Sequence, residues 1–429
     1  MQGFKNALAL LLCSSAAGLA ACGDGSAAGT NATGGVGAAS GGSLTAGHGG
    51  NGVSGNGNGV SGNGNGVSGS GAGAPAGGTA GGGAAGSSGG AGAANAGTTS
   101  GGTAAGNAGM PASAGAGPGG ASAFPASSPF YQDISKAKLD DQSATLLAAL
   151  DALGWGDADE RTLLGIDFSF NINVADQGLA PRAFTQSPTF YSPDCDTAPV
   201  PLPPGGKGEG VDDYACSGGD DCHLFVYQST RLYELYQSNI TGGMATGGTF
   251  TSTCLVVWDL TKDYWVAKAP PNFSRGDGCT GADAAGLPMT PLLLTKQDIA
   301  SGEVRHALRF TIDNNRIAAD QYVHPATHLG GPTGGADMLP YGARLRLRAD
   351  YDLTGLPNAN ARTVAKALQT YGMYLADGGN IYISATTDAV DLIDNSILGA
   401  LGPSDFEMVD GGTRIDAASQ DCKHVPITQ

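Results

Sequence analysis

The chain has 429 residues, 73 of them glycine, and its 21 Lys and Arg against 38 Asp and Glu give a formal net charge of −17. This acidity excludes a generally basic nucleic-acid binder, because such proteins attract phosphate groups through clustered Lys and Arg. The glycine content and the lack of long apolar runs exclude an all-helical bundle and a multi-span membrane protein.

The first feature in chain order is an export signal over residues 1–21. Lys5 precedes the apolar run Ala7–Leu12, which is too short to span a bilayer but fits the core of a signal peptide. The signal ends in Leu19-Ala20-Ala21-Cys22, which resembles the lipobox of bacterial lipoproteins. The resemblance implies that Cys22 is lipidated and anchors the chain to a membrane. Because Gly23 rather than Asp follows, we expect the outer membrane or cell surface; an ordinary cleavage site beside a chance cysteine is the alternative.

Residues 22–123 are expected to form a disordered tether. Between residues 23 and 123 there are 39 glycines, one charged residue (Asp24) and no aromatic residue. Such a stretch buries too little apolar surface to offset the entropy lost on ordering. A flexible coil of this kind gives reach to a single folded, disulfide-containing domain over residues 124–429.

Alternating apolar and polar residues predict that the folded part is mainly β. From Ile166 to Val174 every second residue is apolar, which is typical of a half-buried strand. Similar patterns predict strands over residues 223–227, 254–260, 264–267, 304–312, 343–349 and 381–384.

Two helices are also predicted. Asp140 and Asp141 are candidate caps for a Leu-rich helix that stops at Gly154, and Asn360 is the candidate cap of a second helix. Many short strands with few helices favour a sandwich or barrel-like domain with one or two helices. A mixed α+β domain is the alternative.

Six cysteines remain after Cys13 leaves with the signal and Cys22 serves as the anchor. An even number in an exported chain predicts disulfides, here among Cys195, Cys216, Cys222, Cys254, Cys279 and Cys422. Cys216 with Cys222 is the favoured pair, because only five residues separate them, and Cys254 with Cys279 is the next.

A metal site is the competing interpretation of the same region. Cys222-His223 lies beside acids that offer oxygen ligands, and Asp212, Asp213, Asp220 and Asp221 together suggest calcium. The spacing matches neither a zinc site nor an EF-hand, so we expect disulfides, solvated loop acids and no cofactor.

An ordered series of motifs follows from Gly281 onward: Gly281-Ala-Asp-Ala-Ala-Gly-Leu-Pro288, His306-Ala-Leu-Arg-Phe-Thr311, Pro325-Ala-Thr-His328, Tyr341-Gly-Ala-Arg-Leu-Arg-Leu347 and Tyr371-Gly-Met-Tyr-Leu-Ala-Asp377. The series resembles a family of exported, largely uncharacterised bacterial proteins that carry such motifs in this order. The resemblance covers about Leu224 to Asp388 and implies one continuous domain without implying an activity. This chain departs from it at Tyr341, where the family pattern has methionine, and in a cysteine-bearing insertion over residues 214–222.

Five residues are candidates for catalysis. His306 is expected on a strand face with Leu308 and Phe310, either as a core residue or as a general base at a cleft. Glu234 and Asp283 are candidate acids, of the kind that glycosidases use in pairs. His328 is the fourth candidate; a metal face shared with His324 is disfavoured because Pro325 between them opposes a helix.

Arg344 is the fifth candidate, as the first of three alternating arginines with Arg346 and Arg348. Three guanidinium groups on one strand face predict either cross-strand pairs with Asp or Glu, or a row that binds an anionic polysaccharide. Arg305 and Arg309 are candidates to extend such a row.

The leading hypothesis is a cell-surface lipoprotein whose β-rich domain acts on an extracellular polysaccharide, as a glycoside hydrolase or a polysaccharide lyase. A non-catalytic carbohydrate-binding or adhesion module, or a structural envelope lipoprotein, is the alternative. No serine sits in a GxSxG elbow, so an α/β-hydrolase has no support, and no GxGxxG motif stands between a strand and a helix as a nucleotide site requires.

Overall fold

The computed structural model describes residues 123–156, 163–216, 221–265 and 274–429. The predicted signal peptide, the anchor Cys22 and all of the tether except Ala123 lie outside these described residues. Within the described ranges no helix combines the length and the apolar character that crossing a membrane requires.

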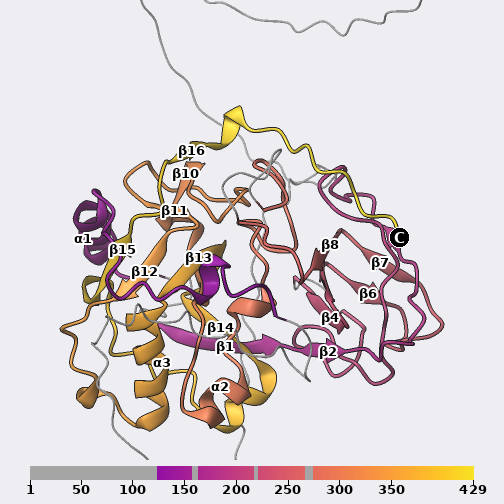
Figure 1. The fold of residues 1–429 in the computed structure, drawn as a ribbon, viewed down its shortest axis with the longest axis horizontal. Coiled ribbons are helices and arrows are strands. Elements are labelled where there is room, and N and C mark those ends of the chain that lie inside the picture. Colours follow the sequence, from indigo (N-terminus) through magenta and orange to yellow (C-terminus); the bar gives the residue numbers. More distant parts are fainter. Residues whose placement is uncertain (1–122, 157–162, 217–220, 266–273) are drawn as a thin grey trace, which may run out of the picture. The chain divides into compact units, whose positions relative to one another are not determined.

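The described residues form a mainly β fold, as predicted, with strands in several mixed sheets that close no barrel among these residues (Figure 1). The largest sheet has six strands in the order β1 (Gly165–Phe170), β14 (Tyr382–Thr386), β9 (Leu308–Ile312), β13 (Met373–Gly378), β12 (Arg344–Leu347) and β15 (Phe406–Val409). The pairs β1 with β14 and β9 with β13 are parallel, whereas β14 with β9 and both neighbours of β12 are antiparallel.

Three smaller sheets complete the strands. A four-stranded sheet has the order β2 (Ile172–Val174), β4 (Leu224–Gln228), β5 (Arg231–Tyr236) and β8 (Cys254–Asp259). The other two are β11 (Leu339–Tyr341), β10 (Ile317–Tyr322) and β16 (Ile415–Asp416), and β3 (Thr185–Gln186), β7 (Phe250–Ser252) and β6 (Asn239–Ile240).

The predicted strand over residues 166–174 is in fact two strands in two sheets. The break falls at Asn171, whose side-chain amide donates to the carbonyl of Gly208 at 2.8 Å. Phe170 before the break packs with Phe225 on β4 at a centroid distance of 5.9 Å, and both belong to a small apolar cluster with Ala282 and Met289. This cluster joins the two larger sheets to the segment that carries the candidate site.

Three α-helices lie in the described ranges, against one or two predicted. They are α1 (Ser143–Leu153), α2 (Lys296–Ser301) and α3 (Ala359–Thr370); α1 packs on β15 and α3 on β12. The predicted stop of α1 at Gly154 is confirmed, with φ of 71°. The six-residue helix α2 was not predicted because it is too short to show a helical period.

The predicted helix caps are wrong. No side chain caps α1 at Gln142; instead Asp140 accepts the backbone N–H of Gln142 at 2.9 Å before the helix starts. Helix α3 is capped by Asn358, whose side chain accepts from Ala361 N, because Asn358 has the extended backbone that a cap requires. Asn360 lies inside the helix and donates to the carbonyl of Leu392.

Two strand predictions also need correction. Tyr264 and Trp265 lie in a turn, and the rest of the predicted strand over residues 264–267 is outside the described residues. Strand β9 begins only at Leu308, so His306 lies at a bend before the strand and not on its apolar face.

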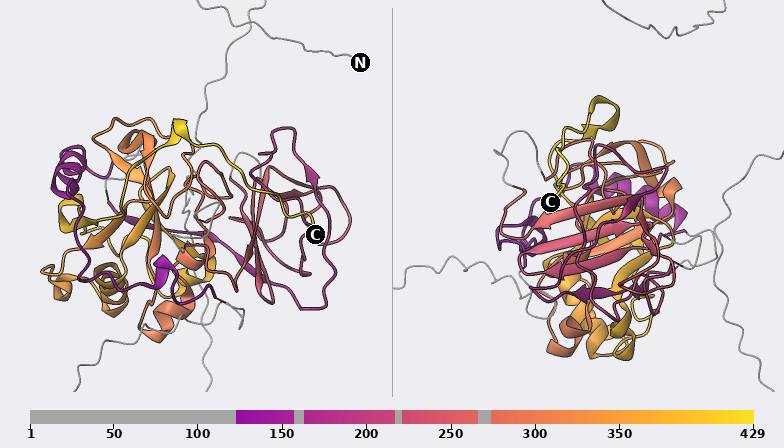
Figure 2. Two further views of the ribbon diagram at one scale, coloured as in Figure 1. Left: turned by 45° about the horizontal axis from the view of Figure 1, so that its top comes forward. Right: turned by 90° about the vertical axis from the view of Figure 1, so that its right-hand side faces the viewer.

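All six candidate cysteines are in disulfides: Cys195–Cys254, Cys216–Cys222 and Cys279–Cys422. The local Cys216–Cys222 pair is confirmed. The predicted Cys254–Cys279 pair is wrong, because β8 places Cys254 5.3 Å (Cα–Cα) from Cys195 while the C-terminal segment brings Cys422 to Cys279. That segment follows β16 and ends beside the strands of the four-stranded sheet, where Ile427 packs (Figure 2).

Candidate functional site

A cavity of about 430 Å³ opens where segments distant in sequence meet beside β13. Its walls are formed by Tyr191, Asp221, Tyr236, residues 280–284, residues 328–331 and Asp377. Asp377 is on β13 and Tyr236 ends β5, so the cavity draws on both larger sheets. The segment over residues 280–284 begins the first of the motifs noted in the sequence.

Behind the cavity, Arg309 on β9 holds two carboxyl groups at once. Its Nε donates to Asp283 Oδ1 at 2.9 Å, and its Nη2 donates to Asp377 Oδ2 at 2.8 Å. Its Nη1 donates to the hydroxyl of Ser384 on β14 at 2.7 Å. Each of the three guanidinium nitrogens thereby has a partner, and the side chain is only 2% exposed. Two carboxyl groups on one guanidinium leave an excess of negative charge if both are ionised.

Burial and this excess negative charge both raise the pKa of Asp377. Burial raises the pKa of Asp377 to about 7 against the attraction of Arg309, and the negative charges of Asp283 and Asp221 add to the rise. Burial also raises the pKa of Asp283, but Asp283 additionally accepts the N–H of Leu287 at 3.2 Å. Asp377 accepts the N–H of Gly378 at 2.8 Å, so each carboxyl group of the pair has a backbone donor, and a pKa of about 7 leaves Asp377 protonated below neutral pH.

A second ion pair, between His223 and Glu209, contacts the cavity wall at Ala282. His223 Nδ1 contacts Glu209 Oε2 at 2.7 Å, and His223 Nε2 contacts the carbonyl of Ala282 at 2.9 Å. Burial lowers the pKa of His223, but the charge of Glu209 and its hydrogen bond outweigh burial and raise the pKa to about 9. Burial likewise raises the pKa of Glu209, yet His223 lowers it to about 2. His223 is therefore an imidazolium that donates to Ala282 and fixes the wall.

Two tyrosines and a histidine complete the cavity. The rings of Tyr191 and Tyr236 stack with centroids 6.3 Å apart and an interplanar angle of 15°. Tyr236 also donates its hydroxyl to Asp221 Oδ1 at 3.4 Å. His328 Nδ1 lies 3.0 Å from the carbonyl of Ala284, and burial lowers the pKa of His328. A neutral imidazole that donates from Nδ1 has its lone pair on Nε2.

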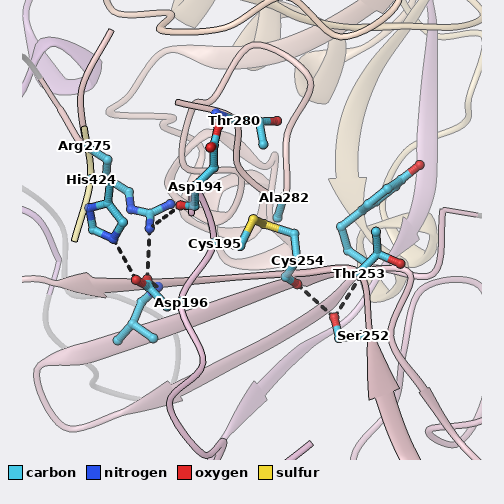
Figure 3. The surroundings of a disulfide bond; sticks show 12 residues. Asp194, Cys195, Asp196, Ser252, Thr253, Cys254, Arg275, Thr280, Ala282 and His424 are labelled. Carbon is cyan, nitrogen blue, oxygen red and sulfur yellow. Dashed lines mark hydrogen bonds and ion pairs between the residues drawn. A yellow bond between two sulfur atoms is a disulfide. The ribbon is translucent and has the colours of Figure 1, made fainter. Parts of the chain in front are cut away.

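Residues beside the Cys195–Cys254 disulfide also hold the cavity wall in place (Figure 3). The carboxylate of Asp194 accepts the N–H of Thr280, a cavity residue, at 2.9 Å. The neighbouring Asp196 is fully buried and contacts Arg275 Nη2 at 3.1 Å and His424 Nε2 at 2.7 Å. These contacts tie the C-terminal segment to the cavity wall.

Of the five predicted catalytic residues, the structure brings together only Asp283 and His328. His306 lines a different cavity of about 670 Å³, where its Nε2 contacts Asp298 Oδ2 at 3.3 Å. Burial opposes charge on His306, but the attraction of Asp298 raises the pKa of His306 above its usual value.

Glu234 lines neither cavity and is a structural carboxyl. It is 1% exposed, and it accepts hydrogen bonds from Trp258 Nε1 at 2.9 Å, from Met289 N at 2.9 Å and from Thr290 N at 2.8 Å. With its oxygens saturated by protein donors, Glu234 has no reach to a substrate.

Arg344 and its neighbours do not form a row on one open face. Arg344 is 7% exposed and donates to the carbonyls of Tyr371 and Gln132. Arg346 makes the expected cross-strand pair, with its Nε 2.8 Å from Glu407 Oε1 on β15. Arg348 is exposed, lies beyond β12 and pairs with Asp350.

The sequence indicated Asp221 and His223 only as candidate metal ligands, and it missed Asp377 and the ion pairs of Arg309 and His223. Asp377 closes one of the noted motifs and Arg309 lies in another, but nothing in a linear motif indicates that the two side chains meet. The acids proposed for calcium have protein partners instead: Asp212 pairs with Lys207 at 2.6 Å, Asp213 accepts from Ala215 N, and Asp220 is outside the described residues. Among the residues that the structure describes, no three His, Cys, Asp or Glu side chains are grouped to hold a metal ion.

Comparisons of this chain with protein-family models, with curated proteins and with solved structures found no match.

Proposed function

We propose that the chain is a bacterial cell-surface lipoprotein, anchored through Cys22, whose β-rich domain hydrolyses an extracellular polysaccharide in the cavity lined by Asp221 and Asp377. The observation that carries this proposal is that two carboxyl groups in different surroundings line one cavity beside a stacked pair of tyrosines. Asp377 is enclosed among other charges, whereas Asp221 is exposed. Glycosidases depend on such a difference between two carboxyl groups.

In the proposed reaction Asp377 is the general acid. Its proton passes to the glycosidic oxygen as the bond from the anomeric carbon to that oxygen breaks. Asp221 takes a proton from water, and the resulting hydroxide forms the new bond at the anomeric carbon. The aromatic faces of Tyr191 and Tyr236 offer apolar contact to sugar rings, as such faces do in binding sites.

The lining favours hydrolysis over elimination. A lyase that acts on uronates must neutralise the uronate carboxylate, and Lys or Arg is the usual partner for a carboxylate. No Lys or Arg is among the described residues that line the cavity, and Arg309 behind it is occupied by Asp283, Asp377 and Ser384. Arg344, expected to neutralise substrate charge, is buried elsewhere.

The test is incubation of the full-length lipoprotein in detergent with a panel of polysaccharides. Hydrolysis is measured as the appearance of new reducing ends. We expect Asp377→Asn and Asp221→Asn each to lower the rate by about 100-fold or more. Asp320→Asn is the matched control, because Asp320 is exposed on β10 away from the cavity. Loss of activity above pH 7 is expected as Asp377 loses its proton.

Two results would contradict the proposal: no product from any polysaccharide, or product formation that both variants leave unchanged. Binding of a glycan without products would instead support the alternative, a carbohydrate-binding module, which the stacked pair of Tyr191 and Tyr236 favours. Neither binding nor products would support a structural envelope role.

A further inference from the structure

We propose that the cavity binds the protonated amino group of a deacetylated amino sugar, so that the polysaccharide substrate is cationic. This inference rests on the proposed function for the place of the site and adds the chemical class of the substrate.

The charge balance of the cavity favours a cationic ligand. Three of its lining residues are acids, namely Asp221, Asp283 and Asp377, and none of the described lining residues is Lys or Arg. The nearest cations are already matched: Arg309 serves two carboxyl groups, and His223 is paired with Glu209. The negative potential that remains attracts a cation and repels a uronate.

The hydrogen-bonding groups of the lining also favour an ammonium group. His328 presents a lone pair at Nε2, because its Nδ1 donates to the carbonyl of Ala284. Asp221 has one oxygen engaged by Tyr236, and its other oxygen is an acceptor. An ammonium group offers three donors and no acceptor, whereas a hydroxyl or an acetamido group offers both. The acceptors of the cavity therefore fit an ammonium group best.

The aromatic pair adds to this preference. The face of a tyrosine ring carries partial negative charge and attracts a cation within about 6 Å of its centre. Tyr191 is 40% exposed, so part of its ring is open to a ligand beside Asp221. A metal ion would need several close oxygen or nitrogen ligands, and the described residues provide no such group. An organic cation that aromatic rings can contact is the better match.

Binding of an ammonium group has a measurable consequence at Asp377. The charged and titratable groups that act on Asp377 or are affected by it are Arg309 on β9, Asp283, Asp221, His223 just before β4, Tyr236 on β5 and Tyr341 on β11. A bound positive charge offsets the repulsion from Asp221 and Asp283 and so lowers the pKa of Asp377. Near pH 7, binding is therefore expected to release part of a proton, and hydrolysis in the complex requires the lower pH at which Asp377 stays protonated.

The experiment is calorimetric titration of the full-length lipoprotein at pH 7 with oligosaccharides of equal length. The probes are oligomers of glucosamine, N-acetylglucosamine, glucose and galacturonate. We expect the glucosamine oligomer to bind about tenfold more tightly than the uncharged oligomers, which is the scale of one well-placed charge contact. Comparison of buffers with different ionisation heats is expected to show proton release for glucosamine only.

Two variants distinguish binding in the cavity from the general attraction of a polycation to an acidic protein. Asp221→Asn is expected to abolish the preference for glucosamine, whereas Asp320→Asn removes the same charge elsewhere and is expected to keep the preference. An equal loss of the preference for glucosamine in both variants, or no loss of it in either, would overturn the inference.

The remaining outcomes distinguish this inference from the proposed function. Equal or tighter binding of N-acetylglucosamine or glucose oligomers, with hydrolysis that depends on Asp377, would contradict recognition of an amino group. It would still support the proposed hydrolase. Preferential binding of the galacturonate oligomer would overturn both the amine and the argument against elimination. Binding of none of the four, with no hydrolysis of any polysaccharide, would overturn both proposals.

Discussion

Asp283 and Asp377 share a single guanidinium, with Arg309 Nε 2.9 Å from the first carboxyl group and Nη2 2.8 Å from the second. Asp283 is enclosed in protein, and the side chain of Asp377 is 20% exposed toward the cavity. Arg309 thus pairs with both carboxyl groups, and Asp377, whose pKa is about 7, titrates near neutrality.

Replacement of Asp283 tests this relationship directly. We expect Asp283→Asn to lower the pKa of Asp377 from about 7, because a negative neighbour is removed and Arg309 then serves one carboxylate only. Carboxyl-carbon NMR of the folded protein measures this pKa. Asp320→Asn is the control and should leave it unchanged. An unaltered pKa in Asp283→Asn would show that burial and Asp221, without Asp283, raise the pKa of Asp377.

The Glu209–His223 ion pair predicts a loss of stability in alkaline solution. The pKa of His223 is raised from 6.5 to about 9 in the folded state, so its contribution is fully present below pH 6.5 and is lost as pH rises through 9. The wild-type free energy of unfolding should therefore fall across this interval by on the order of 3 kcal/mol more than that of His223→Gln.

Urea unfolding of both proteins at a series of pH values measures this difference. A second, acidic loss is expected because the pKa of Glu209 is lowered to about 2: its contribution is present above pH 4.5 and is lost as pH falls toward 2. Parallel curves for the wild type and His223→Gln between pH 6.5 and 9 would contradict the ion pair.

The disulfides predict unequal losses of stability on removal. Cys279 and Cys422 are 143 residues apart in sequence, whereas Cys216 and Cys222 are 6 apart. In the chain-entropy account, the longer loop stabilises the folded state by roughly 5 kcal/mol and the shorter by about 2 kcal/mol. Thermal unfolding of the two Cys→Ser double variants should show the larger loss for the pair at residues 279 and 422. A larger loss for the local pair would contradict this order.

The alternating arginines predict a contrast between buried and exposed side chains. Arg346→Met leaves Glu407 without its partner inside the protein, for an expected loss of roughly 3 kcal/mol. Arg348→Met removes an exposed pair with Asp350 and should change stability by less than about 0.5 kcal/mol. Denaturant unfolding of both variants measures the difference. Similar small losses would mean that Arg346 is more accessible than its 7% exposure indicates.

Local patterns predicted the features that depend on near neighbours in sequence. The alternation in residues 381–384 and 343–349 indicates β14 and β12, Gly154 marks the end of α1, and the close spacing of Cys216 and Cys222 indicates their disulfide. Each depends on residues within a few positions of one another. Predictions failed where a local pattern was interrupted, as at Asn171 between β1 and β2.

The site could not be assembled in the same way. His306 and Asp283 were chosen together from motifs, yet they line different cavities, and Asp377 was not chosen although it ends a motif. The contact of Arg309 with Asp377 arises because β9 and β13 are adjacent parallel strands. Strand order is set by the packing of the whole domain and leaves no trace in the spacing of residues along the chain.

The amino-acid sequence by itself determined the mainly β character of the folded part and the prospect of disulfides, because both depend on composition and short-range alternation. Only the tertiary structure decided that Asp283, Arg309 and Asp377 meet, that Glu234 and Arg344 are structural, and that Cys422 reaches Cys279. These outcomes depend on contacts between segments far apart in the chain, where burial and neighbouring charges set the chemistry of each side chain.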